Sequence, residues 1–155
     1  YAPDAIETAK KLILQGADIV TDTNMALAGI NKRALARHGG EAHCFMADEK
    51  VAALAKERGV TRATVSMEFA AQLNKPVIFA VGNAPTALIR LYEMIAGGEF
   101  RPAFIIGVPV GFVNVEAAKE LILKTDVPYI INRGRKGGSN VAAAICNALL
   151  YELGR

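Results

Sequence analysis

Apolar positions along the chain follow two different spacings. In some segments they recur every three or four residues, which is the period of an amphipathic helix. In others they form short continuous runs rich in Val, Ile and Phe, which is typical of strands buried on both faces of a sheet. Pro3–Gln15 is a clear example of the first pattern and Pro76–Val81 (PVIFAV) of the second. The two patterns alternate along the whole chain.

This alternation predicts helices at Pro3–Gln15, Asn24–Ile30, Asp48–Arg58, Thr61–Leu73, Ala84–Ile95, Asn114–Leu123 and Ser139–Leu153. It predicts strands at Ala17–Thr21, Ala42–Met46, Pro76–Val81, Ala103–Val108 and Pro128–Asn132. Strand–helix alternation at this spacing indicates βαβ units, and therefore a three-layer α/β/α fold with a mainly parallel central sheet. Because no linker-like stretch or internal repeat interrupts the pattern, residues 1–155 are predicted to form a single domain.

Composition supports a globular protein and excludes several other classes. The chain has 155 residues, of which 52% are hydrophobic and 21% charged, so it can bury a core. No apolar run reaches the roughly 18–20 residues of a membrane span, so we expect a soluble protein. The net charge of +3 is spread without basic blocks, which does not indicate nucleic acid and suits a polyanionic small ligand.

The two cysteines, Cys44 and Cys146, lie far apart and have no metal-binding spacing. We expect two buried thiols in a cytoplasmic protein rather than a disulfide. His38 is expected at the carboxyl terminus of a helix, as a partner of the helix dipole, and His43 on the second strand. For each, a structural role is favoured over a catalytic one. The sequence predicts no metal site and no cofactor.

Candidate chemistry follows from the topology, because ligands of open α/β sheets collect at the carboxyl ends of the strands. Four loops are expected there, and all are rich in glycine, proline and small polar residues. They are Thr21–Met25, Gly82–Leu88, Pro109–Asn114 and Arg133–Ser139.

Two of these loops favour anion binding. Gly82 and Asn83 precede a helix with Pro85 in its first turn, and the free N–H groups at such a helix start are able to hold a carboxylate. In the last loop, Arg133, Arg135 and a lysine flank glycines before a helix. Arginine is the better carboxylate partner because its planar guanidinium binds both oxygens. The alternative is a solvated basic turn. Arg62 is by default an exposed surface arginine.

Familiar catalytic and nucleotide-binding motifs are absent from the sequence. It contains no GxGxxG after a strand, no Walker loop and no GxSxG elbow, which disfavours nucleotide enzymes and nucleophilic catalysis.

The loops together resemble the precorrin-8X / cobalt-precorrin-8 methylmutase family. The specific matches are Gly82–Leu88 (GNAPTAL), Gly107–Val113 (GVPVGFV) and Arg133–Ser139 (RGRKGGS), followed by Asn147–Leu150. Weaker matches are Ala17–Met25, Gly29 and Thr61-Arg62. Three motifs in order, within a resemblance that covers nearly the whole chain, make it specific.

The resemblance implies an isomerase of corrin (vitamin B12) biosynthesis that moves a methyl group from carbon 11 to carbon 12 of a corrinoid tetrapyrrole substrate. It implies a homodimer and no cofactor. On this resemblance, the substrate-binding candidates are Arg62, Asn83, Thr86, Gly111, Arg133, Arg135 and Ser139.

The resemblance also implies a histidine that protonates the ring, in a segment that family members carry before the helix starting near Pro3. We therefore expect the chain to be N-terminally truncated relative to the family, and no catalytic residue is assigned within it. General acid catalysis typically contributes roughly 10²–10⁴-fold in rate, so binding is expected to outlast turnover without that segment.

Two alternatives stay open on the sequence. One is a tetrapyrrole-binding protein that holds the corrinoid without isomerising it. The other is a generic α/β phosphate- or nucleotide-binding domain, with which only the basic loop Arg133–Lys136 agrees. The sequence does not distinguish a cobalt-containing from a metal-free substrate.

Overall fold

The computed structural model describes residues 4–110, 115–132 and 137–153. Its strands are β1 (Asp18–Thr21), β2 (Ala42–Cys44), β3 (Val77–Val81), β4 (Phe104–Gly107) and β5 (Tyr129–Ile131). Its helices are α1 (Ala5–Leu14), α2 (Asn24–Gly29), α3 (Lys32–Ala36), α4 (Glu49–Arg58), α5 (Arg62–Ala70), α6 (Pro85–Ala96), α7 (Val115–Leu123) and α8 (Ser139–Leu153).

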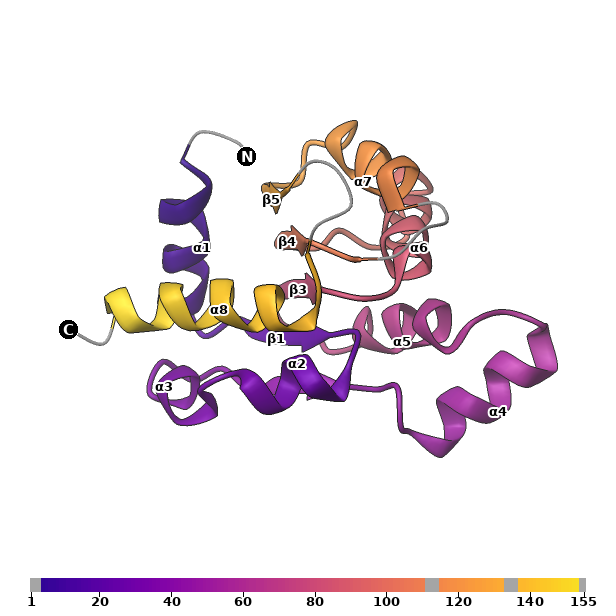
Figure 1. The fold of residues 1–155 in the computed structure, drawn as a ribbon, viewed down its shortest axis with the longest axis horizontal. Helices are drawn as coiled ribbons and strands as arrows, with labels where there is room; N and C mark the ends of the chain where they lie inside the picture. The colour runs from indigo at the N-terminus through magenta and orange to yellow at the C-terminus, as the bar shows by residue number, and fades with distance from the viewer. Residues whose placement is uncertain (1–3, 111–114, 133–136, 154–155) are drawn as a thin grey trace.

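The five strands form one parallel sheet in the order β2-β1-β3-β4-β5. The chain first moves from β1 to one edge of the sheet and then returns through β3 to the other edge. Helices cover both faces: α1 and α8 lie on one side of the sheet, and α6 and α7 on the other (Figure 1). The predicted three-layer α/β/α fold is confirmed, and the sheet is wholly rather than mainly parallel.

Alternating residues of β3 supply the two halves of the core. Ile78 and Ala80 join the cluster that packs under α1, α3 and α8. Val77, Phe79 and Val81 join the cluster under α5, α6 and α7. Every residue of this strand is buried, which explains why its sequence is a continuous apolar run rather than an alternating one.

Helix ends follow the predicted signals. The Thr61 hydroxyl accepts a hydrogen bond from the backbone N–H of Thr64 at 3.1 Å and caps α5. Gly59 ends α4 in the left-handed conformation with φ +66°, and Pro85 is the first residue of α6. The Asn114 cap predicted for α7 lies outside the described residues.

The structure corrects several details. Helix α3 was predicted only by its end near His38. Strand β2 is two residues shorter than predicted and α5 is three residues shorter at its carboxyl end. Cys44 is partly exposed rather than buried because β2 is a short edge strand. Cys146 is buried as predicted, and burial raises its pKa to about 12. Both thiols are free.

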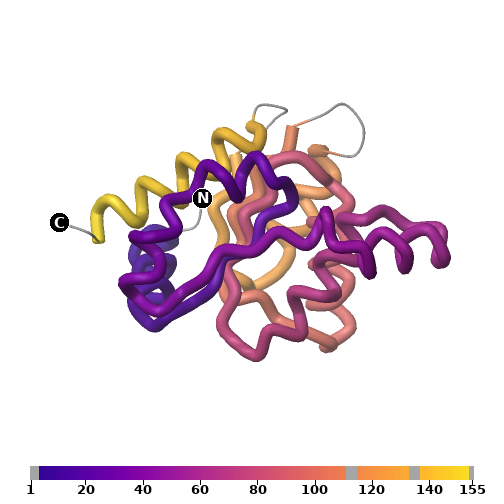
Figure 2. The backbone as a smooth tube through the Cα atoms, turned by 90° about the horizontal axis from the view of Figure 1, so that it is seen from below, coloured from indigo at the N-terminus to yellow at the C-terminus, as the bar shows by residue number. Residues whose placement is uncertain are grey.

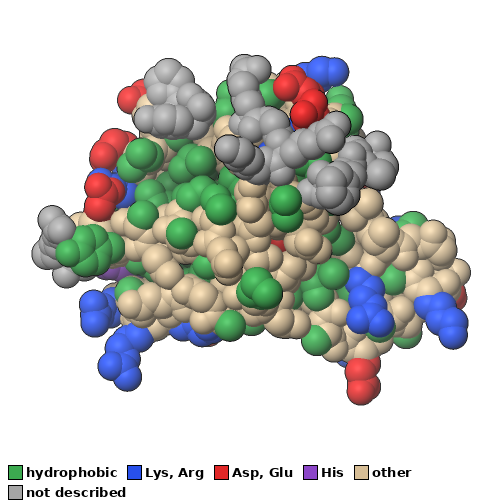
Figure 3. Space-filling view, viewed as in Figure 1, with side chains coloured by type: hydrophobic (Ala, Val, Ile, Leu, Met, Phe, Trp, Pro, Cys, Tyr) green, Lys and Arg blue, Asp and Glu red, His purple; other side chains and the backbone are tan. Residues whose placement is uncertain are grey.

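Two surface features lie away from the carboxyl ends of the strands. Helix α4 projects from the body of the molecule in both views of the backbone (Figures 1 and 2). An apolar hollow of about 460 Å³ lies between α1, α8 and β5, where Figure 3 shows hydrophobic side chains gathered. Its lining includes Ile6, Ile130, Ile145 and Tyr151. Among the described residues, no helix has the length and apolar character needed to cross a membrane.

Candidate functional site at the carboxyl ends of the strands

The described parts of the four predicted loops meet where the carboxyl ends of the strands lie, because parallel strands end on the same side of the sheet. This side is called the carboxyl edge, or simply the edge. Two of the seven predicted binding residues, Asn83 and Thr86, follow β3, and Ser139 begins α8 after β5. Arg62 begins α5. Gly111, Arg133 and Arg135 lie outside the described residues.

The buried carboxylate of Asp22 connects β1 to the loop after β3. Its Oδ1 accepts a hydrogen bond from the backbone N–H of Gly82 at 2.8 Å. Its Oδ2 accepts two more, from the N–H groups of Asn83 at 2.8 Å and Ala84 at 2.6 Å. The side chain is wholly buried, so these bonds are screened little by water.

These contacts correct the prediction that the N–H groups before α6 are open to a ligand carboxylate. They are already bonded to a carboxylate of the chain itself. Burial raises the pKa of Asp22 above its ordinary value, and the bonds from Gly82, Ala84 and Asn83 offset only part of that effect. The N–H groups before α6 therefore stabilise the fold of the chain itself and are not open to a ligand.

Close backbone contacts bring the loop after β5 against the loop after β3. A side chain at Gly82 would place its Cβ 2.7 Å from the carbonyl oxygen of Gly138 and from the Cα of Ser139. The Ser139 hydroxyl lies 2.8 Å from the hydroxyl of Thr23. The N–H of Gly138 donates to the carbonyl of Val108, just past β4, at 2.8 Å. All four strand ends are thus joined directly.

A second set of contacts places the start of α5 beside the start of α6. The Thr61 hydroxyl lies 3.1 Å from that of Thr86, so the cap of α5 also contacts a predicted binding residue. Arg62 follows Thr61 directly and is exposed. The structure therefore brings Arg62 and Thr86 into one neighbourhood, and Asn83 and Ser139 into the adjoining one.

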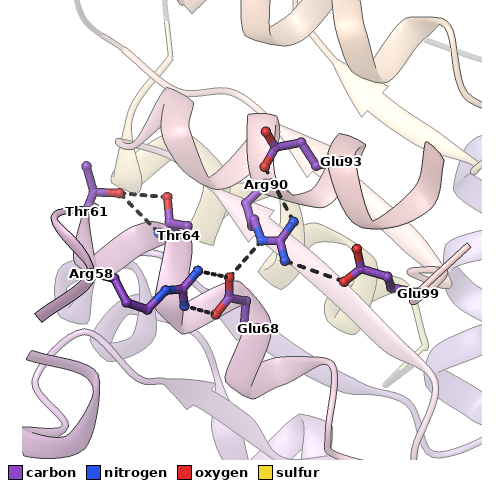
Figure 4. A network of polar contacts seen from close by, with 7 residues as sticks. All are labelled: Arg58, Thr61, Thr64, Glu68, Arg90, Glu93 and Glu99. Carbon is purple, nitrogen blue, oxygen red and sulfur yellow. Dashed lines mark hydrogen bonds and ion pairs between the residues drawn. The ribbon is translucent and has the colours of Figure 1, made fainter. Parts of the chain in front are cut away.

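An ion-pair network holds α5 against its neighbours (Figure 4). Glu68 of α5 accepts hydrogen bonds from Arg58, at the end of α4, at 3.0 Å and from Arg90 of α6 at 2.8 Å. Arg90 also pairs with Glu93 and Glu99. The guanidinium of Arg58, followed by that of Arg90, lowers the pKa of Glu68 against the opposing effect of burial. Both arginines are engaged with carboxylates, so the network orients α5 and Arg62 rather than offering an anion site.

The sequence analysis missed two buried polar residues at this edge. Asp22 lies in the predicted loop Thr21–Met25 but was assigned no role, although an acidic residue directly after a buried strand itself indicates a buried polar contact. Lys119 of α7 is only 3% exposed and donates to Asn132, just past β5, at 2.9 Å. Burial lowers its pKa. The sequence indicated it only by placing a lysine where the helical spacing predicts an apolar residue.

At the opposite end of β1, Asp18 contacts residues just before β3, just before β2 and on β2 itself. Its Oδ1 accepts from the ammonium of Lys75 at 2.6 Å and from the N–H of Glu41 at 2.9 Å. Its Oδ2 lies 2.9 Å from Nε2 of His43, which lies on β2 as predicted. Burial alone would raise the pKa of Asp18, but Lys75, the Glu41 N–H and His43 together lower it.

The substitution Asp18→Asn is expected to remove part of the acid sensitivity of the fold. Because the folded-state pKa lies below the unfolded value, this carboxylate stabilises the fold above the unfolded pKa of about 3.9. That stability is lost as the pH falls through the folded-state pKa. We expect Asp18→Asn to lower the free energy of unfolding by about 1–2 kcal/mol at pH 7, since it weakens charged hydrogen bonds. The difference should shrink below about pH 4.

Urea unfolding at pH 7 and at pH 3 measures this difference. The control is Asp126→Asn, which removes a charge that pairs with Arg101 at the surface and should change stability little. An equal loss in both variants, or one that does not depend on pH, would contradict the role of Asp18.

Among the described residues, no group of three or more His, Cys, Asp and Glu side chains is arranged to hold a metal ion. In the described part of the chain, the candidate site therefore consists of the exposed side chains of Asn83 and Arg62 and the partly buried hydroxyls of Thr86 and Ser139. Side chains of these types are suited to binding and orienting a polar ligand.

The fold is that of an α/β/α protein, and its candidate ligand site lies at the carboxyl ends of the strands. A family model described as precorrin-8X methylmutase matches residues 1–152. The cobalt-precorrin-8 methylmutase of Salmonella typhimurium is 45% identical over 99% of this chain and 71% of its own length. The enzyme of the same name from Priestia megaterium is 44% identical over 96% of this chain and 66% of its own.

A solved structure gives the same result. The precorrin-8X methyl mutase from Thermus thermophilus superposes with a TM-score of 0.86 at 38% identity, over 97% of this chain and 73% of that one. The chain belongs to the precorrin-8X methylmutase family. The names of the family and of these relatives are those of methylmutases, enzymes that move a methyl group within one molecule. This chain spans about two thirds of the length of the two curated relatives.

Proposed function

We propose that this protein moves a methyl group from carbon 11 to carbon 12 of precorrin-8X or cobalt-precorrin-8, giving hydrogenobyrinate or cobyrinate. The observation that carries the proposal is the match of residues 1–152 to the methylmutase family. It is supported by the meeting of the described parts of the loops after β1, β3, β4 and β5, to which all three motifs that carry the resemblance belong. The proposal treats residues 1–155 as one methylmutase-like domain.

The reaction makes modest chemical demands on the protein. One bond between the methyl group and carbon 11 breaks, and one bond to carbon 12 forms within the same molecule, so nothing is oxidised or reduced overall. The protein must bind the macrocycle, orient it and favour the electron distribution of the migrating state. The exposed Asn83 side chain and the partly buried hydroxyls of Thr86 and Ser139 suit the first two tasks.

The substrate carries several acetate and propionate groups, and arginine binds carboxylates with two parallel hydrogen bonds. We assign this role to Arg62, Arg133 and Arg135. Asn83, Thr86, Gly111 and Ser139 would contact the macrocycle and its carboxylate-bearing side chains. The support for Arg62 is its exposure and the Thr61–Thr86 contact beside it. The protein is proposed to act as a homodimer in the cytoplasm, where its two free thiols would persist.

Titration with hydrogenobyrinate, followed by its visible absorption, is expected to give a saturable spectral shift. Each of Arg62→Ala, Arg133→Ala and Arg135→Ala should weaken binding about tenfold, because a charge-assisted hydrogen bond contributes about 1.5–3 kcal/mol. The matched control is Arg101→Ala, an exposed arginine before β4 that pairs with Asp126. It removes the same charge at the amino end of the sheet and should leave the affinity unchanged.

Turnover of the substrate, measured beside binding, separates an isomerase from a binding protein. Light scattering on the same samples tests the homodimer, which has twice the mass of the 16.5 kDa chain. The absence of a spectral shift in the unmodified protein would contradict the corrinoid site. Equal weakening by Arg101→Ala would show only a general electrostatic effect of the net charge.

A further inference from the structure

Asp22 occupies an unusual position for a carboxylate. It is wholly buried, yet it accepts hydrogen bonds from the neutral backbone N–H groups of one short segment, Gly82 to Ala84. A carboxylate is a costly group to bury, and a strand end alone does not need one. Its bonds fix three consecutive residues just where the chain turns from β3 into α6.

The segment that Asp22 fixes contacts the loop after β5 and leads directly into α6. Gly82 packs directly against Gly138 and Ser139. Asn83 is exposed at the edge, and Thr86 lies in the first turn of α6 beside Thr61. A shift of this segment would therefore move three of the residues proposed to bind the substrate.

We propose that Asp22 is a positioning residue: its carboxylate holds the Gly82–Ala84 segment in the one place that sets Asn83, Thr86 and Ser139 for substrate binding. The inference rests on the proposed function for the identity of the ligand. Asp22 itself does not touch the substrate. It closes the start of α6 to outside anions, so the substrate carboxylates are left to the arginines.

Asp18 provides a matched comparison within the same strand. It is also buried, but it lies at the amino end of β1 and contacts separate segments, through the side chains of Lys75 and His43 and the N–H of Glu41. A general need for buried carboxylates in the core would make the two residues equivalent. A positioning role at the ligand edge makes only Asp22 important for binding.

The test is chemical rescue of Asp22→Ala by formate. This substitution removes the carboxylate and leaves three N–H donors around a space that formate can fill. We expect the affinity for hydrogenobyrinate to fall by about 10- to 100-fold, because the released segment no longer holds Asn83, Thr86 and Ser139 in place and small misplacements of positioned groups have effects of this size. Formate should restore most of that affinity and raise the melting temperature, whereas chloride at equal ionic strength should not.

Asp18→Ala should lower the melting temperature but bind hydrogenobyrinate as the unmodified protein does. The proposal is overturned if Asp22→Ala binds normally, or if Asp18→Ala and Asp22→Ala weaken binding equally. Should Asp22→Ala fail to fold, Asp22→Asn keeps one acceptor oxygen and serves in its place. Its amides at Gly82, Asn83 and Ala84 should exchange hydrogen faster than in the unmodified protein, while those of Asp18→Asn should not.

The two proposals fail in different ways. If the unmodified protein does not bind hydrogenobyrinate, the proposed function is wrong. The positioning role is then still decided by amide exchange: formate should slow the exchange of these three amides in Asp22→Ala, and unchanged exchange would refute it.

Discussion

The substitution Gly82→Ala is expected to weaken hydrogenobyrinate binding by more than tenfold and to lower the free energy of unfolding by about 1–3 kcal/mol, the usual range for overpacking a close contact. The added Cβ would lie 2.7 Å from the Gly138 carbonyl oxygen and 2.7 Å from the Cα of Ser139. Both are backbone atoms, so no flexible side chain can move aside. The loops after β3 and β5 must separate, and Ser139 moves away from Thr23.

The control for this prediction is Gly98→Ala. Gly98 follows α6 with φ +71°, and a Cβ there meets nothing within 4 Å. Gly98→Ala should lower the free energy of unfolding by about 1–2 kcal/mol through backbone strain alone. Gly98 is remote from the candidate site. Isothermal titration and urea unfolding of both variants measure the two effects. Normal binding by Gly82→Ala would show that the contact between the two loops does not shape the site.

The fold was largely predictable because its signals are local. The apolar run PVIFAV predicts a strand buried on both faces, and β3 is that strand. Thr61, Gly59 and Pro85 mark helix ends by capping and backbone geometry that depend only on neighbouring residues. The error at Cys44 has a different origin. Its exposure depends on β2 being an edge strand, and strand order is a property of the whole sheet.

The sequence predicted which loops form the candidate site but not which of their residues contact one another. The rule that ligands bind at the carboxyl ends of parallel strands located the loops correctly. It did not reveal that Asp22 fills the start of α6, because that contact joins residues sixty positions apart. The same limit applies to the bond between Thr23 and Ser139 and to the Glu68 network, in which each residue alone resembles an ordinary polar surface position.

The substitution Phe79→Ala is expected to lower the free energy of unfolding by about 3–5 kcal/mol, which is the usual cost of removing a buried phenylalanine. Phe79 lies in the central strand of the sheet and is wholly buried. Its ring packs edge-on against Phe100 with centroids 5.9 Å apart, so its loss also removes an aromatic contact. Out of a typical total of about 5–15 kcal/mol, this is a large fraction.

Urea unfolding at pH 7 measures the loss, and Leu14→Ala is the control because Leu14 is 55% exposed at the end of α1; its cost should stay within about 0.5 kcal/mol. Since Phe79 lies within the core and not at the strand ends, the fraction of Phe79→Ala that remains folded should bind hydrogenobyrinate with unchanged affinity. That pattern is the reverse of the one expected for Asp22→Ala, in which binding falls further than stability explains. A weakened affinity in folded Phe79→Ala would mean that packing within the core also sets the positions of the loops that form the candidate site.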